Sequence, residues 1–165
     1  MKRTAVTTMI ITIILLNLAG CLNSIDPIQP PQPEGQDDPI IDATQTVTLF
    51  LPNSDADGFD TKDVLTDGTA EDIVALLVAE GSLPQASVLL SFHQFGKNGV
   101  VDMSAPYGQA LKQTGTTGEY LLLGSLVNTL LKFYQLDTVT LTIEGEVLET
   151  GHNIYDTPLG FYQNY

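Results

Sequence analysis

The longest apolar segment of this chain, from Tyr120 to Tyr134, sets the strongest limit on how the chain can fold. Leucines dominate it, and its apolar side chains would cover most of the circumference of a helix. Thr116-Thr117-Gly118-Glu119 precedes it and fits a capping box, so we predict a helix from Thr116 to about Gln135. A helix so poor in polar side chains must be nearly buried or must lend a face to a partner.

Shorter strands and helices are predicted on both sides of this helix. Alternating apolar residues indicate strands, and Asn98-Gly99 is a strong hairpin signal. Thr69, followed by two acidic residues, is typical of a helix N-cap. We predict strands over 46–51, 88–93, 100–103, 138–143 and 147–148, helices over 70–80 and 104–111, and a polar loop over 53–68. This order favours an α/β fold, a single small α/β sandwich in which one mixed sheet has helices packed on one face.

The N-terminus has the three parts of a secretory signal. Lys2 and Arg3 precede an apolar run over 9–18, and small residues lead to Cys21, the only cysteine of the chain. The run is shorter than the roughly 20 apolar residues that span a bilayer. Leu18-Ala19-Gly20-Cys21 resembles the bacterial lipobox, so we predict a signal peptide over 1–20 and lipidation of Cys21. The other interpretation is an ordinary signal peptide with a chance cysteine.

The composition divides the rest of the chain into three parts. Five of the nine prolines lie between residues 22 and 43, together with acidic and amide residues, so 21–43 is predicted to be a tether. Residues 44–151 have the size of one compact domain. Residues 152–165 form a tail with four aromatic residues, interpreted either as a sticky surface or as a loose acidic segment: Tyr155, Phe161, Tyr162 and Tyr165.

The charge of the chain argues against nucleic acid as a partner. Six basic and twenty acidic residues give a formal charge of −14, and removal of 1–20 would leave four basic residues and a charge of −16. Affinity for nucleic acid or anionic lipid headgroups depends on Lys and Arg side chains that neutralise phosphates. The acidic surface could instead attract a basic partner or cations, although its simplest role is solubility.

No residue pattern supports catalysis. His93 and Ser91 share one face of a predicted strand near Asp102, but the sequence has no strained nucleophile turn, and the second histidine, His152, lies in the tail. We therefore predict no enzyme activity and no cofactor. Asn53 to Asp60 imitates the start of a calcium loop without the bidentate glutamate that such a loop needs, so an acidic solvent loop is the alternative to an ion site.

Two segments resemble the GerMN domain family of sporulation and spore germination proteins. They are Leu121-Leu122-Leu123-Gly124-Ser125-Leu126-Val127-Asn128-Thr129-Leu130 and Val139-Thr140-Leu141-Thr142-Ile143-Glu144-Gly145. Phe50-Leu51-Pro52 and Gly99-Val100-Val101-Asp102 also fit the family's pattern. The resemblance covers about 105 residues in a single copy, without the second tandem copy of some members or the immunoglobulin-like companion domain of others.

The resemblance implies a lipid-anchored envelope protein without catalytic activity, on the extracytoplasmic face of a bacterial cell membrane. It also implies a fold like the ring-building modules of secretion and sporulation machines, in which helices of one copy pack on the sheet of the next. By this analogy the chain would assemble or stabilise a membrane complex through envelope proteins or self-association, with Ser125, Asn128 and Thr129 as interface candidates. The alternative is a lipoprotein that binds a wall fragment, an ion or a small solute.

Overall fold

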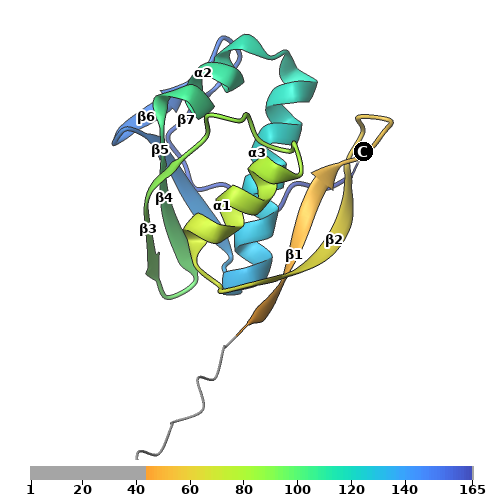
Figure 1. The fold of residues 1–165 in the computed structure, drawn as a ribbon. Coiled ribbons are helices and arrows are strands. Elements are labelled where there is room, and N and C mark those ends of the chain that lie inside the picture. The colour runs from red at the N-terminus through yellow and green to blue at the C-terminus, as the bar shows by residue number, and fades with distance from the viewer. Residues whose placement is uncertain (1–43, 165) are drawn as a thin grey trace, which may run out of the picture. The chain divides into compact units, whose positions relative to one another are not determined.

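The computed structural model describes residues 44–164, which form seven strands and three helices (Figure 1). The predicted signal peptide, Cys21 and the tether lie outside the described residues. In chain order the elements are β1 (Gln45–Pro52), β2 (Phe59–Thr66), α1 (Ala70–Ala79), β3 (Leu89–Phe95), β4 (Asn98–Met103), α2 (Ala105–Gln113), α3 (Thr116–Tyr134), β5 (Thr138–Ile143), β6 (Glu146–Glu149) and β7 (Ile154–Tyr155).

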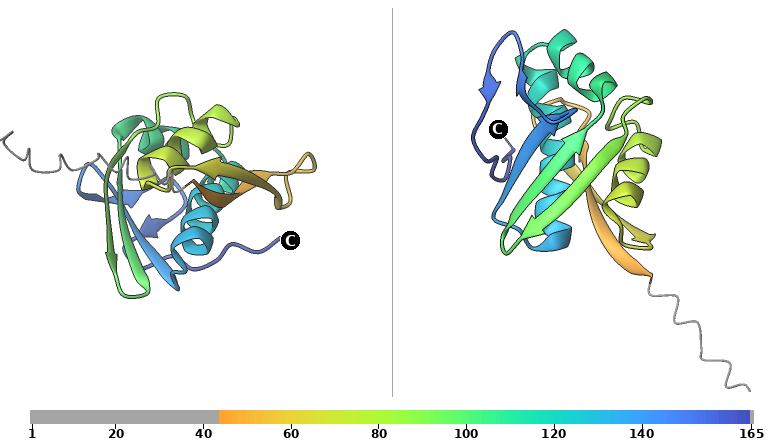
Figure 2. Two further views of the ribbon diagram at one scale, coloured as in Figure 1. Left: turned by 60° about the horizontal axis from the view of Figure 1, so that its bottom comes forward. Right: turned by 90° about the vertical axis from the view of Figure 1, so that its left-hand side faces the viewer.

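The main sheet has five strands in the order β3-β4-β5-β6-β7. β4 and β5 are parallel, and the other pairs are antiparallel, so the sheet is mixed as predicted. The helices lie behind the sheet when it faces the viewer, and its other face is left uncovered (Figure 2, right). The predicted α/β fold with helices on one face of a mixed sheet is therefore confirmed.

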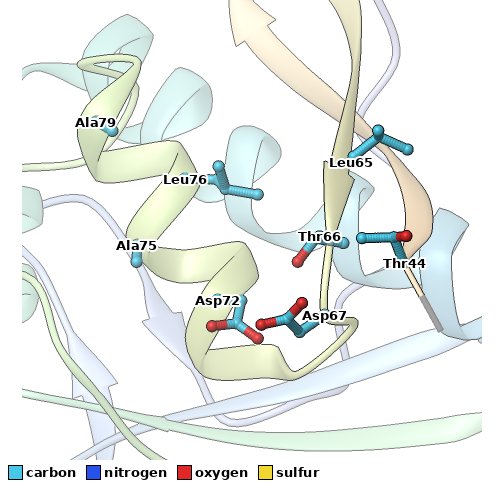
Figure 3. A pocket seen from close by; sticks show the side chains of 8 residues that line it. All are labelled: Thr44, Leu65, Thr66, Asp67, Asp72, Ala75, Leu76 and Ala79. Carbon is cyan, nitrogen blue, oxygen red and sulfur yellow. The ribbon is translucent and has the colours of Figure 1, made fainter. Parts of the chain in front are cut away.

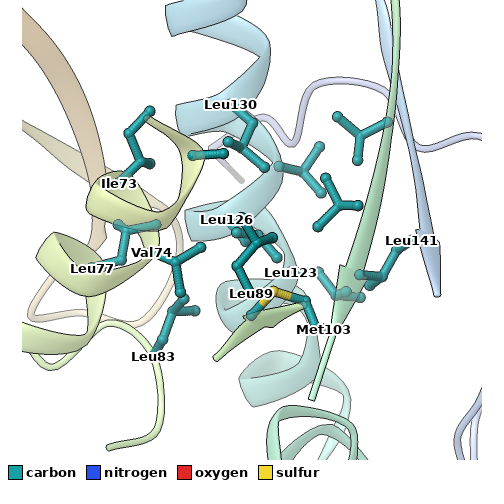
Figure 4. Close-up of a cluster of buried hydrophobic side chains, with 14 of the residues drawn as sticks. Ile73, Val74, Leu77, Leu83, Leu89, Met103, Leu123, Leu126, Leu130 and Leu141 are labelled. Atoms are coloured by element: carbon teal, nitrogen blue, oxygen red, sulfur yellow. The ribbon is translucent and has the colours of Figure 1, made fainter. Parts of the chain in front are cut away.

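α3 is the centre of the core. It lies between the main sheet and the β1–β2 hairpin, with α1 beside it (Figure 1). Leu126 and Leu130 are fully buried among side chains from α1, β3, β4 and β5 (Figure 4). The apolar circumference of this helix is thus covered by its own domain, because the sheet and the hairpin bury opposite sides of it.

β1 and β2 form a separate two-stranded sheet, whereas the sequence predicted a loop over 53–68. Only the two ends of β2, Phe59 and Thr66, are buried, and the residues between them are exposed or half-buried. The strand has no apolar alternation, because its middle faces solvent on both sides. Backbone pairing with β1, rather than burial, holds it in place.

The β3–β4 hairpin is present, but its turn lies two residues before the predicted Asn98-Gly99 pair. Gly96 and Lys97 form the turn, and Gly96 has a φ of +62°, which suits the first position of a tight hairpin turn. Asn98 instead accepts a 2.7 Å hydrogen bond from Thr138 of β5. An Asn-Gly pair can therefore mark the start of a strand rather than the turn itself.

The two predicted helix caps differ in outcome. Thr69 caps α1 as expected, because its hydroxyl accepts from the Asp72 amide and the Asp72 carboxylate bonds the Thr69 amide. The capping box predicted at Thr116 and Glu119 is absent, and Gly115 is the N-cap of α3 without a side-chain bond. Within residues 44–164 no helix is both long enough and apolar enough to cross a membrane.

Candidate functional site

The C-terminal segment, by which we mean residues 150–164, packs against α3. Asn128 holds its backbone with two hydrogen bonds, from Nδ2 to the Tyr162 carbonyl at 2.9 Å and from the Tyr162 amide to Oδ1 at 2.8 Å. Leu159 forms a bridge to Val139 at the edge of β5, and Phe161 contacts the ring of Phe50 edge-on at 5.3 Å. Of the two interpretations of this tail, the loose acidic segment is wrong for residues 159–164, because they are bonded to the domain.

Ser125, Asn128 and Thr129 were predicted as interface candidates, but all three are fully buried. Thr129 donates to the Ser125 carbonyl at 2.7 Å and accepts from the Phe50 amide at 3.1 Å. The Asn128 and Thr129 side chains join α3 to the C-terminal segment and to β1 of their own chain, whereas the Ser125 hydroxyl is buried without a hydrogen-bond partner among the described residues. None of the three side chains is accessible to another subunit in the described fold.

The C-terminal segment also brings two polar groups to Glu119, in the first turn of α3. Glu119 is 3 % exposed, and its Oε1 accepts hydrogen bonds from Thr150 at 3.0 Å and from the Tyr155 hydroxyl. Oε2 is buried and has no hydrogen-bond partner among residues 44–164. This arrangement explains the missing capping box, because the carboxylate turns toward the C-terminal segment instead of the helix backbone.

A cavity of about 420 Å³ lies beside Glu119. Its walls are largely aromatic, and Tyr120 packs against Tyr162 at 5.0 Å between ring centroids. The lining consists of Thr116, Glu119, Tyr120, Leu123, His152, Asn153, Tyr155 and Tyr162. We call this cavity the Glu119 pocket.

Burial and negative charge act together on the tyrosines of the Glu119 pocket. Burial is the main cause that raises the pKa of Tyr162 to about 12, with further contributions from Tyr120 and Glu119. Burial also raises the pKa of Tyr155, and the hydrogen bond to Glu119 raises it further. Both hydroxyls therefore stay protonated at neutral pH and can serve as hydrogen-bond donors.

The sequence did not predict this pocket, because each of its main residues fitted another interpretation. Glu119 fitted a helix cap, and Tyr155 and Tyr162 fell in a segment interpreted as a tail. The available signal was the concentration of tyrosines near the C-terminus, since three of the six tyrosines lie beyond residue 150. Aromatic residues at that density rarely remain in solvent.

A second hollow, of about 440 Å³, lies between the end of β2 and α1 (Figure 3). Leu76 and Leu65 contribute apolar surface, and Leu65 is 69 % exposed. Asp67 and Asp72 lie together at one end of it, but Asp72 is already engaged by Thr69. The hollow therefore offers an apolar surface rather than a set of reactive groups.

The residues weighed for catalysis do not come together as a reactive set. In the β3–β4 register Ser91 lies opposite Asp102, and His93 lies opposite Val100, so all four face the uncovered side of the sheet. Asp102 accepts hydrogen bonds at Oδ1 from Thr142 at 2.7 Å and from the Gly145 amide at 2.8 Å. Its carboxylate thus braces the β5–β6 turn rather than orienting the histidine.

The acidic segment Asn53 to Asp60 forms the turn of the β1–β2 hairpin over Asn53 to Gly58 and enters β2 with its last two residues. Asn53 bonds Asp57 twice, from Nδ2 to the carboxylate at 2.7 Å and from the Asp57 amide to Oδ1 at 3.1 Å. The described part of the chain contains no group of three or more His, Cys, Asp or Glu side chains placed to hold a metal ion. The hydrogen bonds account for the polar residues of the turn, and calcium binding there stays a hypothesis.

The fold and the sequence together define the class of this protein. Residues 47–149 match the Germane family, described as sporulation and spore germination, and the chain belongs to this family. The matched range runs from within β1 to the end of β6. A comparison with curated protein sequences gave no match.

Solved structures of the same kind support the fold. The first GerMN domain of the sporulation protein GerM from Bacillus subtilis is similar, with 19 % identity and a TM-score of 0.53, over 73 % of this chain and 98 % of that one. The tandem GerMN domains of the same protein match with 17 % identity and a TM-score of 0.50, over 73 % of this chain and 46 % of that one. The described domain therefore corresponds to one GerMN copy.

Proposed function

We propose that this chain is a lipid-anchored, non-enzymatic envelope module that helps to assemble or stabilise a membrane protein complex in sporulation or spore germination. Membership of the Germane family supports the cellular setting. The lipobox-like sequence that ends at Cys21 supports the anchor, since two acyl chains hold a protein stably at a bilayer. The alternative is a lipoprotein that binds a wall fragment, ion or small solute, and it would be anchored at the same membrane surface.

The tether limits where the module acts. The 22 residues from 22 to 43 would span about 70 Å as an extended polyproline chain and about 25 Å as a flexible coil. A domain held within this distance of the bilayer reaches the ectodomains of neighbouring membrane proteins. The anchor therefore supplies a high local concentration of the module near its partners.

The uncovered face of the main sheet is the observation that carries the proposal. All three helices pack on the opposite face, so strands β3 to β6 present their outward side chains without cover (Figure 2, right). Several of these are apolar, including Phe95 at 65 % and Val147 at 52 % exposure. Thr140, at the centre of β5, is half-buried and faces the same way. Large apolar side chains left exposed on an uncovered sheet face favour a protein partner.

The occupant that we propose for this face is another protein, either a further copy of the chain or another envelope protein. The face is mixed in polarity and none of its outward residues lines a described pocket, which suits a helix or a sheet rather than a small solute. The Thr140 hydroxyl can bond a partner while Phe95 and Val147 supply apolar contact. This mode agrees with the helix-on-sheet packing that the family resemblance implies.

A photocrosslinking experiment in membranes tests the proposal. A photoreactive amino acid replaces Thr140 on the uncovered face, and a matched control replaces Gln109, an exposed residue of α2. We expect protein adducts from position 140 and few or none from position 109. Adducts of twice the chain mass would identify self-association, and others would identify a partner protein. Absence of protein adducts at position 140 in membranes of the producing cell would contradict the proposal.

A further inference from the structure

The described residues satisfy the carboxyl group of Glu119 only in part. Oε1 has two donors, whereas Oε2 is buried without a hydrogen-bond partner in the described chain. A carboxylate oxygen that loses water and gains no donor is costly, so such groups rarely occur without a reason. The position in the first turn of α3 helps, because the helix dipole favours negative charge there. The dipole does not place a donor on Oε2.

The residues around Glu119 determine which ligand can supply a hydrogen-bond donor to Oε2. The Glu119 pocket has no lysine or arginine among its eight lining residues. Three tyrosine rings form much of the wall, from Tyr120, Tyr155 and Tyr162, and aromatic faces attract cations within about 6 Å. An anionic ligand is disfavoured by Glu119 itself. A cation with hydrogen-bond donors matches both the carboxylate and the rings.

We propose that the Glu119 pocket binds a protonated primary amine, toward which the Glu119 side chain turns so that the ammonium group donates a hydrogen bond to Oε2 while its alkyl chain lies among the tyrosine rings. A quaternary ammonium group fits less well, because it has no N–H for the unpaired oxygen. A volume of about 420 Å³ is ample for an amine with a short alkyl chain. This role is independent of the uncovered sheet face.

The pocket also depends on the C-terminal segment, which supplies one wall. Tyr162 enters that wall through the two backbone bonds to Asn128, and the Tyr120 hydroxyl donates to the Gln163 carbonyl. The raised pKa of Tyr162 agrees with this placement, since both burial and the Glu119 charge contribute to it. Occupation of the pocket should therefore tighten the attachment of residues 150–163.

Calorimetric titration of the full chain in detergent with n-butylamine tests the proposal. The chain has no tryptophan, so tyrosine fluorescence gives a second readout, and three of its six tyrosines line the pocket. We expect saturable binding of butylamine and binding at least about tenfold weaker with tetramethylammonium, which lacks the N–H that Oε2 needs. Nα-acetyl-lysine methylamide is titrated in parallel. Binding of this compound would identify a lysine side chain as the source of the ammonium group, whereas binding of butylamine alone would identify a small free amine.

Glu119→Gln is the decisive variant, because it keeps an acceptor for Thr150 and Tyr155 but removes the charge. We expect butylamine affinity to fall at least about tenfold. Glu146→Gln, on exposed β6, removes the same charge away from the pocket and should leave the affinity unchanged. No saturable binding to wild type, equal binding of tetramethylammonium, or equal loss in both variants would overturn the proposal.

Hydrogen exchange, measured on the wild-type chain with and without butylamine, tests the proposal even if Glu119→Gln does not fold. With butylamine bound, peptides covering 116–123 and 150–163 should exchange more slowly, while the β3–β4 hairpin, none of whose residues lines the pocket, should not change. Protection spread evenly over the acidic surface would show general charge attraction and would overturn the assignment to this pocket.

Discussion

Asn128→Ala is the most informative single perturbation, because one side chain connects the buried helix to the end of the chain. The amide is fully buried and makes both a donor and an acceptor bond to the backbone of Tyr162. Alanine removes both partners at once. The Tyr162 amide and carbonyl, which are part-buried, would then be left without bonds unless the segment detaches.

The expected loss of stability follows from these two bonds. Each neutral hydrogen bond contributes about 1 kcal/mol, and a buried group left unpaired costs about 1–3 kcal/mol. Detachment of residues 160–164 would return those groups to water and limit the loss. We therefore expect Asn128→Ala to lower the free energy of unfolding by about 2–4 kcal/mol.

Urea unfolding of the full chain in detergent, followed by far-UV circular dichroism, measures this value. The second arm of a double-mutant cycle is a chain truncated after Leu159, in which Asn128 has lost its partner. There Asn128→Ala should cost about 2 kcal/mol less than in the full chain, since the coupling between the two changes is the energy of the contact. Gln109→Ala, an exposed amide on α2, should change stability by less than about 0.5 kcal/mol. An equal cost of Asn128→Ala with and without residues 160–165 would refute the role of this contact.

Three further changes test other parts of the structure. Gly124→Ala would place a Cβ 2.9 Å from two ring carbons of Phe59 and closer still to a third, so we expect destabilisation of about 1–3 kcal/mol by urea unfolding, against none for Gly151→Ala, which meets nothing within 4 Å. Tyr162 has a pKa raised to about 12, whereas an unfolded tyrosine titrates near 10, so its contribution is complete below pH 10 and is lost as the pH rises from about 10 to 12. Tyr162→Phe should therefore make the fall in stability between pH 9 and pH 11.5 shallower than in wild type, and an unchanged slope would count against the burial of this hydroxyl. Cys21→Ser should move the chain from the detergent phase to the aqueous phase on detergent partitioning. It should abolish the function of the chain in the cell without altering the fold. A variant that was soluble, folded and fully functional would argue against the anchor.

The elements with strong local signals were predictable, and those held by distant contacts were not. α1 followed from the Thr69 cap and its apolar spacing, and β5 followed from its alternation. β2 was missed, because its side chains face solvent and only backbone pairing with β1 makes it a strand. The same limit applies to the pocket, since Glu119 meets Thr150 and Tyr155 more than 30 residues further along the chain.

The amino-acid sequence by itself determined that α3 must be buried, because no arrangement leaves that many leucines in water. It also determined the family, whose pattern is carried by α3 and β5. Only the tertiary structure decided what covers the helix: the main sheet on one side, the β1–β2 hairpin on the other, and the C-terminal segment held by Asn128. The physical reason is that local periodicity records whether a side chain is buried, while its partner depends on contacts between residues far apart in the chain.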